Sequence, residues 1–145
     1  MTRKTIQQRL VLEAAQRMRH PSAEEIYQAI VRKHPNISRG TVYRNLHNLT
    51  ASDVLGRVLI PGGAERFDAT TPPHYHAVCK LCGAVQDAAL PYQDRMQDAA
   101  AACDGFVLEK HDIIFWGICK ECATQIAAQK DQVEEERPAK PTSGG

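Results

Sequence analysis

The sequence predicts an α+β protein in which an N-terminal winged helix-turn-helix is followed by a small α/β domain with a Cys₄ zinc site. Three observations lead to this prediction. The first half contains three helical patterns followed by two short apolar segments around a Pro-Gly-Gly turn. The second half contains two Cys-x-x-Cys pairs. Residues 1–66 carry eleven Lys and Arg against five Asp and Glu, whereas residues 67–145 carry seven against twelve. Such a charge difference is typical of a chain that binds nucleic acid through one half.

The three helices of the first half are predicted from apolar spacing and from the residues at their ends. An apolar stripe over residues 5–18 predicts the first helix, which ends before Pro21 because proline lacks a backbone N–H. Ser22, with a glutamate three residues later, forms a capping box that begins the second helix. Ser38 is the expected N-cap of a third helix, which has an apolar face of its own.

Strands are predicted on both sides of the Pro-Gly-Gly turn, which makes this segment the wing of the first domain. Beyond it, the pattern predicts a strand or hairpin around the first cysteine pair, a helix over 92–105, one or two strands over 106–119 and a short final helix. The charged, proline-bearing segment after these elements is predicted to be a disordered tail. The expected division of the chain is 1–69 for the winged helix, 70–76 for a hinge, 77–129 for the second domain and 130–145 for the tail.

Composition excludes some classes of protein. No apolar run approaches the roughly 20 residues of a membrane span, and the N-terminus has no apolar segment of the kind found in signal peptides. We therefore expect a cytoplasmic protein without a membrane partner. In a reducing compartment, five cysteines point to metal ligands before disulfides.

The two cysteine pairs predict a structural zinc site. Cys79 and Cys82 form one pair, Cys119 and Cys122 the other, and two such pairs complete a closed tetrahedral shell of thiolates. A thioredoxin-like redox site would instead have one pair in a βαβ unit. Cys103 is left over in an alanine-rich segment, where we expect it to be a small buried apolar residue.

A second metal site is suggested by histidines and carboxylates near the first pair. His74 and His76 alternate along an extended segment, so their rings should face the same side. Asp68 precedes them and Asp87 follows, and a set of imidazoles and carboxylates suits Fe(II) or Mn(II) as well as zinc. The alternatives are an exposed histidine pair at a hinge and an aspartate that only caps a turn. Of the remaining histidines, His20 lies too far upstream for this argument, and His34, His47 and His111 are expected to be solvated.

Five segments occur in an order that closely resembles the Fur family of metal-dependent transcriptional repressors: "HPSAEEIY", "ISRGTVYRNL", "RFD", "HYHAVCKLCGAVQD" and "GFVLEKHDIIFWGICKEC". The resemblance covers about residues 3–125. It implies that the first domain binds double-stranded DNA at a palindromic operator. It also implies that residues 77–129 form a dimerisation domain, so that the protein is a homodimer.

Within the family, the chain is most similar to the peroxide-sensing PerR branch. That resemblance implies one structural Zn²⁺ and one regulatory Fe²⁺ or Mn²⁺ per subunit, the latter held by His20, Asp68, His74, His76 and Asp87. It also implies that hydrogen peroxide converts His20 or His74 to 2-oxo-histidine. Iron-sensing members commonly carry glutamate at both aspartate positions, and they often have a further site. The alternative is an iron-responsive repressor of that kind.

Two features bear on the branch. The places that carry ligands of the further site are occupied here by Pro73 and Tyr75, which leaves His111 without partners for a metal. A zinc-sensing member would add a cysteine to the sensing site, and Cys103 does not match that place.

Residues that contact DNA can also be carried over from the family. Tyr43 is expected against bases, and Arg44 stands where some PerR members have asparagine. The complete set of expected DNA contacts is Arg39, Thr41, Tyr43 and Arg44 on the third helix, Arg57 in the wing, and Arg3, Lys4 and Arg9 near the N-terminus.

Two rival functions come from other classes. Asp68, His74 and His76 match the two-histidine, one-carboxylate set of non-haem iron oxygenases. Such an enzyme needs a roomy substrate pocket, for which a chain with a small basic first domain leaves little scaffold. The other rival is a zinc-stapled protein-interaction module, which the basic first half argues against. We therefore predict a regulator and not an enzyme.

Overall fold

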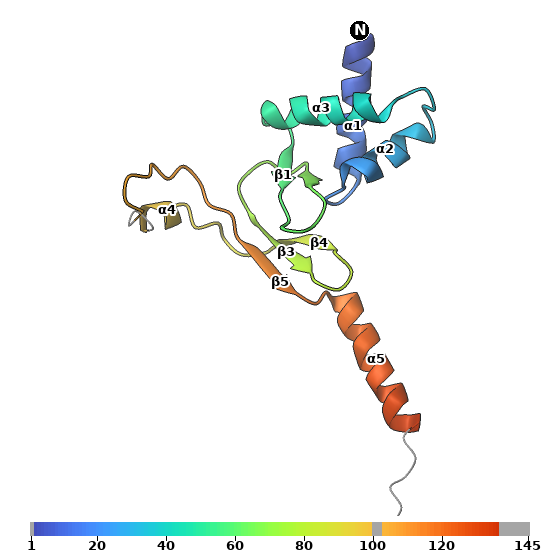
Figure 1. The fold of residues 1–145 in the computed structure, drawn as a ribbon, viewed down its shortest axis with the longest axis vertical. Helices are drawn as coiled ribbons and strands as arrows, with labels where there is room; N and C mark the ends of the chain where they lie inside the picture. The colour runs from blue at the N-terminus through green and yellow to red at the C-terminus, as the bar shows by residue number, and fades with distance from the viewer. Residues whose placement is uncertain (1, 100–102, 137–145) are drawn as a thin grey trace, which may run out of the picture.

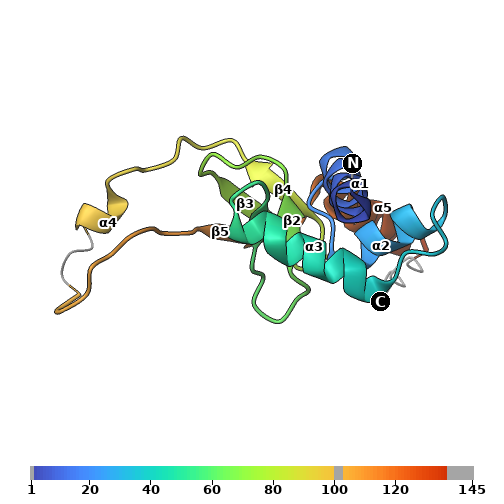
Figure 2. The ribbon, with the colours of Figure 1, turned by 90° about the horizontal axis from the view of Figure 1, so that it is seen from above.

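The computed structural model describes residues 2–99 and 103–136. It contains a three-helix domain with a two-stranded wing, a small three-stranded sheet, and two segments that extend from this sheet in different directions (Figures 1 and 2). The predicted α+β class, with a winged helix-turn-helix at the N-terminus, is confirmed. In the part of the chain that the structure describes, no helix combines the length and apolar character needed to span a bilayer.

The helices of the first domain are α1 (Arg3–Arg17), α2 (Ala23–Val31) and α3 (Arg39–Ala51). Each begins after a hydroxyl side chain that accepts a hydrogen bond from a backbone N–H in the first turn. These N-caps are Thr2, Ser22 and Ser38, and the caps predicted at the second and third of these positions are confirmed. The capping side chains satisfy backbone donors that would otherwise have no partner at a helix end.

The core of this domain lies where the three helices meet the wing. It is built from apolar side chains spaced along each helix, and burying each large one fully contributes about 1.5–3 kcal/mol. The buried cluster comprises Val11, Ala15, Ile26, Ile30, Ile37, Val42, Leu46, Leu49, Leu55 and Phe67.

The wing consists of β1 (Gly56–Val58) and β2 (Arg66–Asp68), which pair antiparallel. Strand β2 also joins the wing to the end of α1. The backbone N–H of Phe67 donates to the carbonyl of Pro21 at 2.9 Å, and Ser22 forms an isolated bridge with Arg66. The short segment between α1 and α2 is therefore held against the strand that ends in Asp68.

The second domain is a sheet of β3 (Tyr75–Cys79), β4 (Val85–Ala88) and β5 (Ile114–Gly117), in the order β4-β3-β5. Strand β4 pairs antiparallel with β3, whereas β5 pairs parallel with it. The chain between β4 and β5 runs out from the sheet as an arm that carries the short helix α4 (Met96–Ala99) (Figure 1).

Three expectations differ from the structure here. Among the described residues of the helix expected over 92–105, only those of α4 are helical, and residues 100–102 lie outside the described part of the chain. Of the one or two strands expected over 106–119, the structure has one, β5, whose four residues pair with His76 to Cys79 of β3. Cys103 is exposed and not buried, because it follows this short helix on the projecting arm.

The final helix, α5 (Lys120–Glu136), is longer than the sequence predicted. The expected disordered tail begins at residue 130, but helix continues for seven residues beyond this point, because Lys, Gln and Glu all have high helix propensity. Residues 137–145 of the expected tail lie outside the described residues.

Candidate metal centres and nucleic-acid interface

Four thiols meet at one end of the three-stranded sheet. Cys79 is the last residue of β3, and Cys82 follows in the turn to β4. The parallel ladder pairs Cys79 with Gly117, so the chain leaves β5 beside the first cysteine pair and places Cys119 and Cys122 at the start of α5. The four sulfur atoms lie within 4.8 Å of one another, and those of Cys82 and Cys119 are 3.7 Å apart.

The electrostatics of this cluster favour a bound cation. Backbone N–H groups of Cys119 and Cys82 lower the pKa of the Cys79 thiol to about 6. The neighbouring side chain of Cys119 raises the pKa of Cys122 to about 12. One thiolate is therefore favoured, whereas full ionisation of the cluster requires a compensating positive charge. Four converging sulfurs fit tetrahedral Zn²⁺, which binds thiolates and leaves no open position here.

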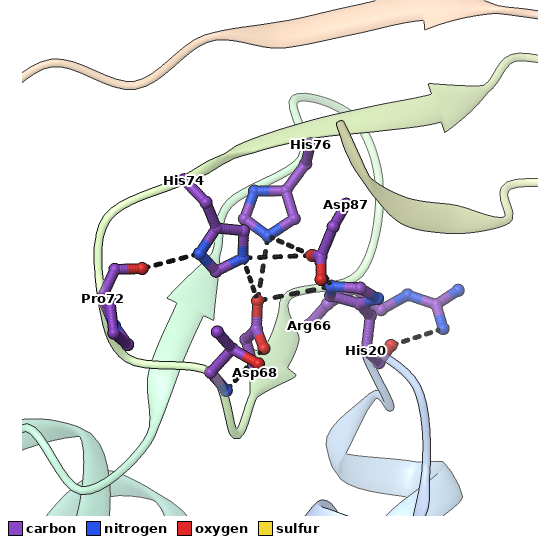
Figure 3. A network of polar contacts seen from close by, with 8 residues as sticks. His20, Arg66, Asp68, Pro72, His74, His76 and Asp87 are labelled. Atoms are coloured by element: carbon purple, nitrogen blue, oxygen red, sulfur yellow. Dashed lines mark hydrogen bonds and ion pairs between the residues drawn. The ribbon is translucent and has the colours of Figure 1, made fainter. Parts of the chain in front are cut away.

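Three imidazoles and two carboxylates form a second cluster between the two domains (Figure 3). His20 lies between α1 and α2, Asp68 ends β2, His74 precedes β3, His76 lies on β3, and Asp87 lies on β4. One ligand atom from each lies within 4.8 Å of all the others. The antiparallel ladder helps to form this cluster, because it pairs His76 directly with Asp87.

All three imidazoles of the cluster approach the same two carboxylate oxygens with Nε2. Asp68 Oδ2 lies 3.3, 2.8 and 3.0 Å from Nε2 of His20, His74 and His76, respectively. Asp87 Oδ1 lies 2.9, 3.0 and 3.5 Å from the same three nitrogens. Ligands held at about 2.1 Å from one cation, at right angles to each other, are about 3 Å apart. The five atoms therefore have the mutual distances of a single coordination shell.

Hydrogen bonds outside this shell orient two of its members. The carbonyl of Pro72 lies 2.7 Å from Nδ1 of His74, and the backbone N–H of Thr70 donates to Oδ1 of Asp68 at 2.9 Å. Such partners fix the ring or carboxylate so that the opposite atom faces the metal. This arrangement suits a hard or borderline divalent cation such as Fe(II) or Mn(II).

Charges in this cluster are strongly coupled. Hydrogen bonding to Asp68 raises the pKa of His20, although burial opposes this. Burial also disfavours ionisation of Asp68, but hydrogen bonds from His20 and His76 hold its pKa well below the usual range. For His74, burial lowers the pKa, and the Pro72 carbonyl and Asp68 more than compensate and raise it. A divalent cation at the centre can take over the pairing that protons on these rings provide.

All nine residues assigned to the two metal sites lie in these two clusters. Spacing along the sequence could not have found His20, which is 48 residues from Asp68. The resemblance to the Fur family supplied it. Its backbone has φ of 45°, an unusual value for a residue other than glycine, and the sequence gives no signal of this turn.

One histidine predicted to be solvated is not. The Nε2 atom of His111 lies 2.8 Å from the hydroxyl of Tyr75, a buried side chain on β3. Its ring also stacks on Tyr92, with 4.6 Å between the ring centres. The prediction failed because neither tyrosine is close to His111 in the sequence.

The side chains expected to contact DNA lie on one helix, the wing and the N-terminus. Tyr43 and Arg44 are exposed on α3, and Arg3, Lys4 and Arg9 are exposed on α1. Two expected cations already have acidic partners. Arg39 binds Glu24 at 2.9 and 3.1 Å, and Arg57 pairs with Glu65 across the wing. Contact between these two arginines and phosphate would compete with those ion pairs.

Comparison with known proteins agrees with this geometry. Residues 1–116 match the Ferric uptake regulator family. The chain is 38% identical over 106 residues to the peroxide operon regulator of Bacillus subtilis, a match that covers 73% of each chain. It is 37% identical over 103 residues to the peroxide-responsive repressor PerR of Staphylococcus epidermidis, covering 71% of this chain and 69% of the relative.

Two solved structures have a similar fold. The ferric uptake regulator of Helicobacter pylori, which has three functional metal binding sites, superimposes with a TM-score of 0.67 at 28% identity, covering 81% of this chain and 79% of the other. The peroxide stress regulator of Campylobacter jejuni superimposes with a TM-score of 0.66 at 27% identity, covering 82% and 90%. The sequence match and the shared fold agree, and the chain therefore belongs to the ferric uptake regulator family.

Proposed function

We propose that the protein is a metal-dependent, DNA-binding transcriptional repressor that responds to hydrogen peroxide. The observation that carries this proposal is the five-residue cluster of imidazoles and carboxylates between the winged helix and the sheet. Both carboxylates are aspartates, and two of the similar proteins named above are a peroxide operon regulator and a peroxide-responsive repressor. The alternative is an iron-responsive repressor that uses the same cluster without sensing peroxide.

The two clusters are proposed to hold different metals. Cys79, Cys82, Cys119 and Cys122 would hold one structural Zn²⁺ per subunit, since thiolates fill the whole shell. The regulatory site would hold Fe²⁺ or Mn²⁺ on His20, Asp68, His74, His76 and Asp87. The two-histidine, one-carboxylate set of an oxygenase is only part of this cluster. With five protein ligands converging, the site leaves less room for a substrate than a triad does, and this favours a regulator.

The regulatory ligands come from both domains, and this suggests how metal controls DNA binding. His20 and Asp68 belong to the winged-helix part, whereas His76 and Asp87 lie on adjacent strands of the sheet. Ligands that close around one cation hold the domains in one relative orientation. Without that restraint, the orientation that fits DNA becomes a minor state, and apparent affinity falls in proportion to its population.

Peroxide sensing is proposed to act on one of two imidazoles in the regulatory cluster. His20, Asp68, His74, His76 and Asp87 would hold Fe(II), which would supply the electron that reduces hydrogen peroxide to an oxidant beside these rings. We propose that one ring, that of His20 or His74, gains one oxygen atom from hydrogen peroxide and becomes 2-oxo-histidine. An oxidised ring is a poorer ligand, so the restraint between the domains is lost and repression ends.

Mass spectrometry tests this assignment. Brief exposure of the Fe(II)-loaded protein to hydrogen peroxide should add a single oxygen to a peptide that contains His20 or His74. The Mn(II)-loaded protein should remain unmodified at the same dose, because Mn(II) gives up an electron to peroxide much less readily. Oxygen found only on cysteine or methionine, or found equally with both metals, would favour the iron-responsive alternative.

A homodimer bound to palindromic double-stranded DNA completes the proposal. Large apolar side chains are exposed on the projecting arm and on β5, among them Phe106 at 74%, Val107 at 90% and Trp116 at 52%. A second copy of the chain would cover them, since a patch of this kind usually marks an interface. A protein that acts on the bacterial chromosome works in the cytoplasm, and we place it there.

The DNA contacts give a prediction that separates base recognition from phosphate binding. Tyr43→Ala should reduce the preference for operator over random DNA, because it removes an exposed side chain from the helix proposed to enter the major groove. Lys4→Ala should weaken binding to both DNAs alike and lower the slope of log affinity against log salt by about one unit. Binding assays over a salt series measure both effects. An equal loss on both DNAs for the Tyr43 variant would show that this residue does not read bases.

A further inference from the structure

We propose that Arg66 is a positioning residue for the regulatory metal site and that it acts by holding the main chain of His20. The proposal rests on the regulatory site described under the proposed function. It concerns a residue that contributes no ligand atom to either cluster.

The ring of His20 lacks the kind of support that the ring of His74 has. The Nε2 atom of His20 faces Asp87 at 2.9 Å, but its Nδ1 atom is buried and has no hydrogen-bond partner among the described residues. Histidines that bind metals almost always donate the other ring N–H to a fixed partner, and His74 has the Pro72 carbonyl at 2.7 Å for this. The orientation of His20 must therefore be set in another way.

The main chain of His20 needs support of its own. Its φ of 45° lies in the left-handed region, where the Cβ of a non-glycine residue is crowded. Arg66 supplies a support, because its Nη1 atom donates to the His20 carbonyl at 3.2 Å (Figure 3). The same Nη1 atom also donates to Oε1 of Glu25 at 2.9 Å. Glu25 in turn accepts a hydrogen bond from Ser22 Oγ at 3.3 Å.

Strand β2 is built so that it holds His20 at two points. Arg66 and Asp68 are two residues apart on the strand and face the same side, whereas Phe67 between them is buried in the core. Arg66 binds the carbonyl of His20, and Asp68 lies 3.3 Å from its ring nitrogen. Burial of Phe67 in the core therefore holds β2 in place, and β2 positions Arg66. Arg66 in turn holds the backbone of His20, which carries the imidazole ring.

The positive charge of Arg66 and its contact with the His20 carbonyl predict opposite effects of its replacement on metal affinity. A positive charge near a divalent cation weakens its binding, so removing the charge alone should strengthen metal binding. If Arg66 positions His20, Arg66→Gln should instead weaken Mn(II) binding by about tenfold, the lower end of the range for residues that support metal ligands. Arg19→Gln is the matched control, because it removes an exposed arginine next to His20 without affecting the contact to its carbonyl.

The experiment is a Mn(II) titration of the zinc-loaded, full-length protein in wild type, Arg66→Gln, His20→Ala and the double variant. If the arginine acts through His20, the double variant should bind Mn(II) no more weakly than His20→Ala alone. The visible spectrum of bound Co(II) should shift in Arg66→Gln toward that of His20→Ala. Arg66→Lys keeps the charge and can donate to the same carbonyl, and it should restore most of the affinity at an unchanged melting temperature.

The outcomes distinguish a failure of the role proposed for Arg66 from a failure of the regulatory site itself. Additive losses in the double variant, or Arg66→Gln affinity equal to or above that of wild type, would overturn the positioning role. If His20→Ala binds Mn(II) as wild type does, the regulatory site itself is misassigned, and the role of Arg66 falls with it. If Arg66→Gln lowers the melting temperature and Arg66→Lys restores only that and not the affinity, the arginine supports the fold and not the ligand.

Discussion

Replacing Cys79 or Cys119 by serine should release the structural zinc, unfold the second domain and abolish most of the dimer. Structural zinc in small thiolate sites contributes on the order of 10 kcal/mol or more to folding, whereas a whole domain is stable by only about 5–15 kcal/mol. Apart from the cysteine cluster, the three-stranded sheet is stabilised by short strands. Its strands have five, four and four residues, and the cysteine cluster joins the end of β3 to the start of α5.

Metal analysis, size-exclusion chromatography and thermal unfolding would measure these losses together. Cys103→Ser is the matched control, because it makes the same chemical change at an exposed cysteine outside the cluster. It should retain zinc, dimer and melting temperature. A Cys79→Ser protein that stays dimeric with an unchanged melting temperature would show that the cluster does not hold the domain together.

His20→Ala should leave the zinc and the dimer intact but abolish the stimulation of DNA binding by metal. His20 is the ligand that precedes the whole DNA-binding helix pair α2 and α3, so its loss removes a direct link between these helices and the cation. A remaining set of four ligands on β2, the hinge and the sheet would restrain the first domain less. Loss of one ligand should also lower Mn(II) affinity by at least about tenfold.

The measurement is DNA binding with and without Mn(II), on duplexes selected from a random pool by the manganese-loaded wild type. His34→Ala serves as the control, since it removes an exposed histidine from the same domain. It should respond to metal as wild type does. Equal affinity of metal-loaded and metal-free wild type, or a normal metal response in His20→Ala, would exclude a bridge between the domains.

Local sequence signals predicted the first domain well. The hydroxyl caps at Ser22 and Ser38 begin α2 and α3 where the sequence placed them, since a cap depends on residues only three positions apart. The paired cysteines are equally local. The parallel pairing of β3 with β5 was not predictable in this way, because the paired residues are 38 positions apart.

The same reason explains what sequence reasoning missed in the candidate site. The contact between Arg66 and the carbonyl of His20 joins residues 46 positions apart. No local sequence pattern predicts that these two residues meet. His111 was misjudged because two tyrosines from other parts of the chain meet it. His20 itself required comparison with a family, since no spacing rule relates it to the hinge.

Strand β3 carries His76 three residues before Cys79, and His74 lies immediately before the strand. Ligands of both clusters thus share one short stretch of backbone. A cation held by the four thiols would fix the end of this strand, and the strand sets the spacing of the two imidazoles. Loss of the cation from the four thiols should therefore also disturb the imidazole cluster, because the two clusters are joined by the backbone of β3.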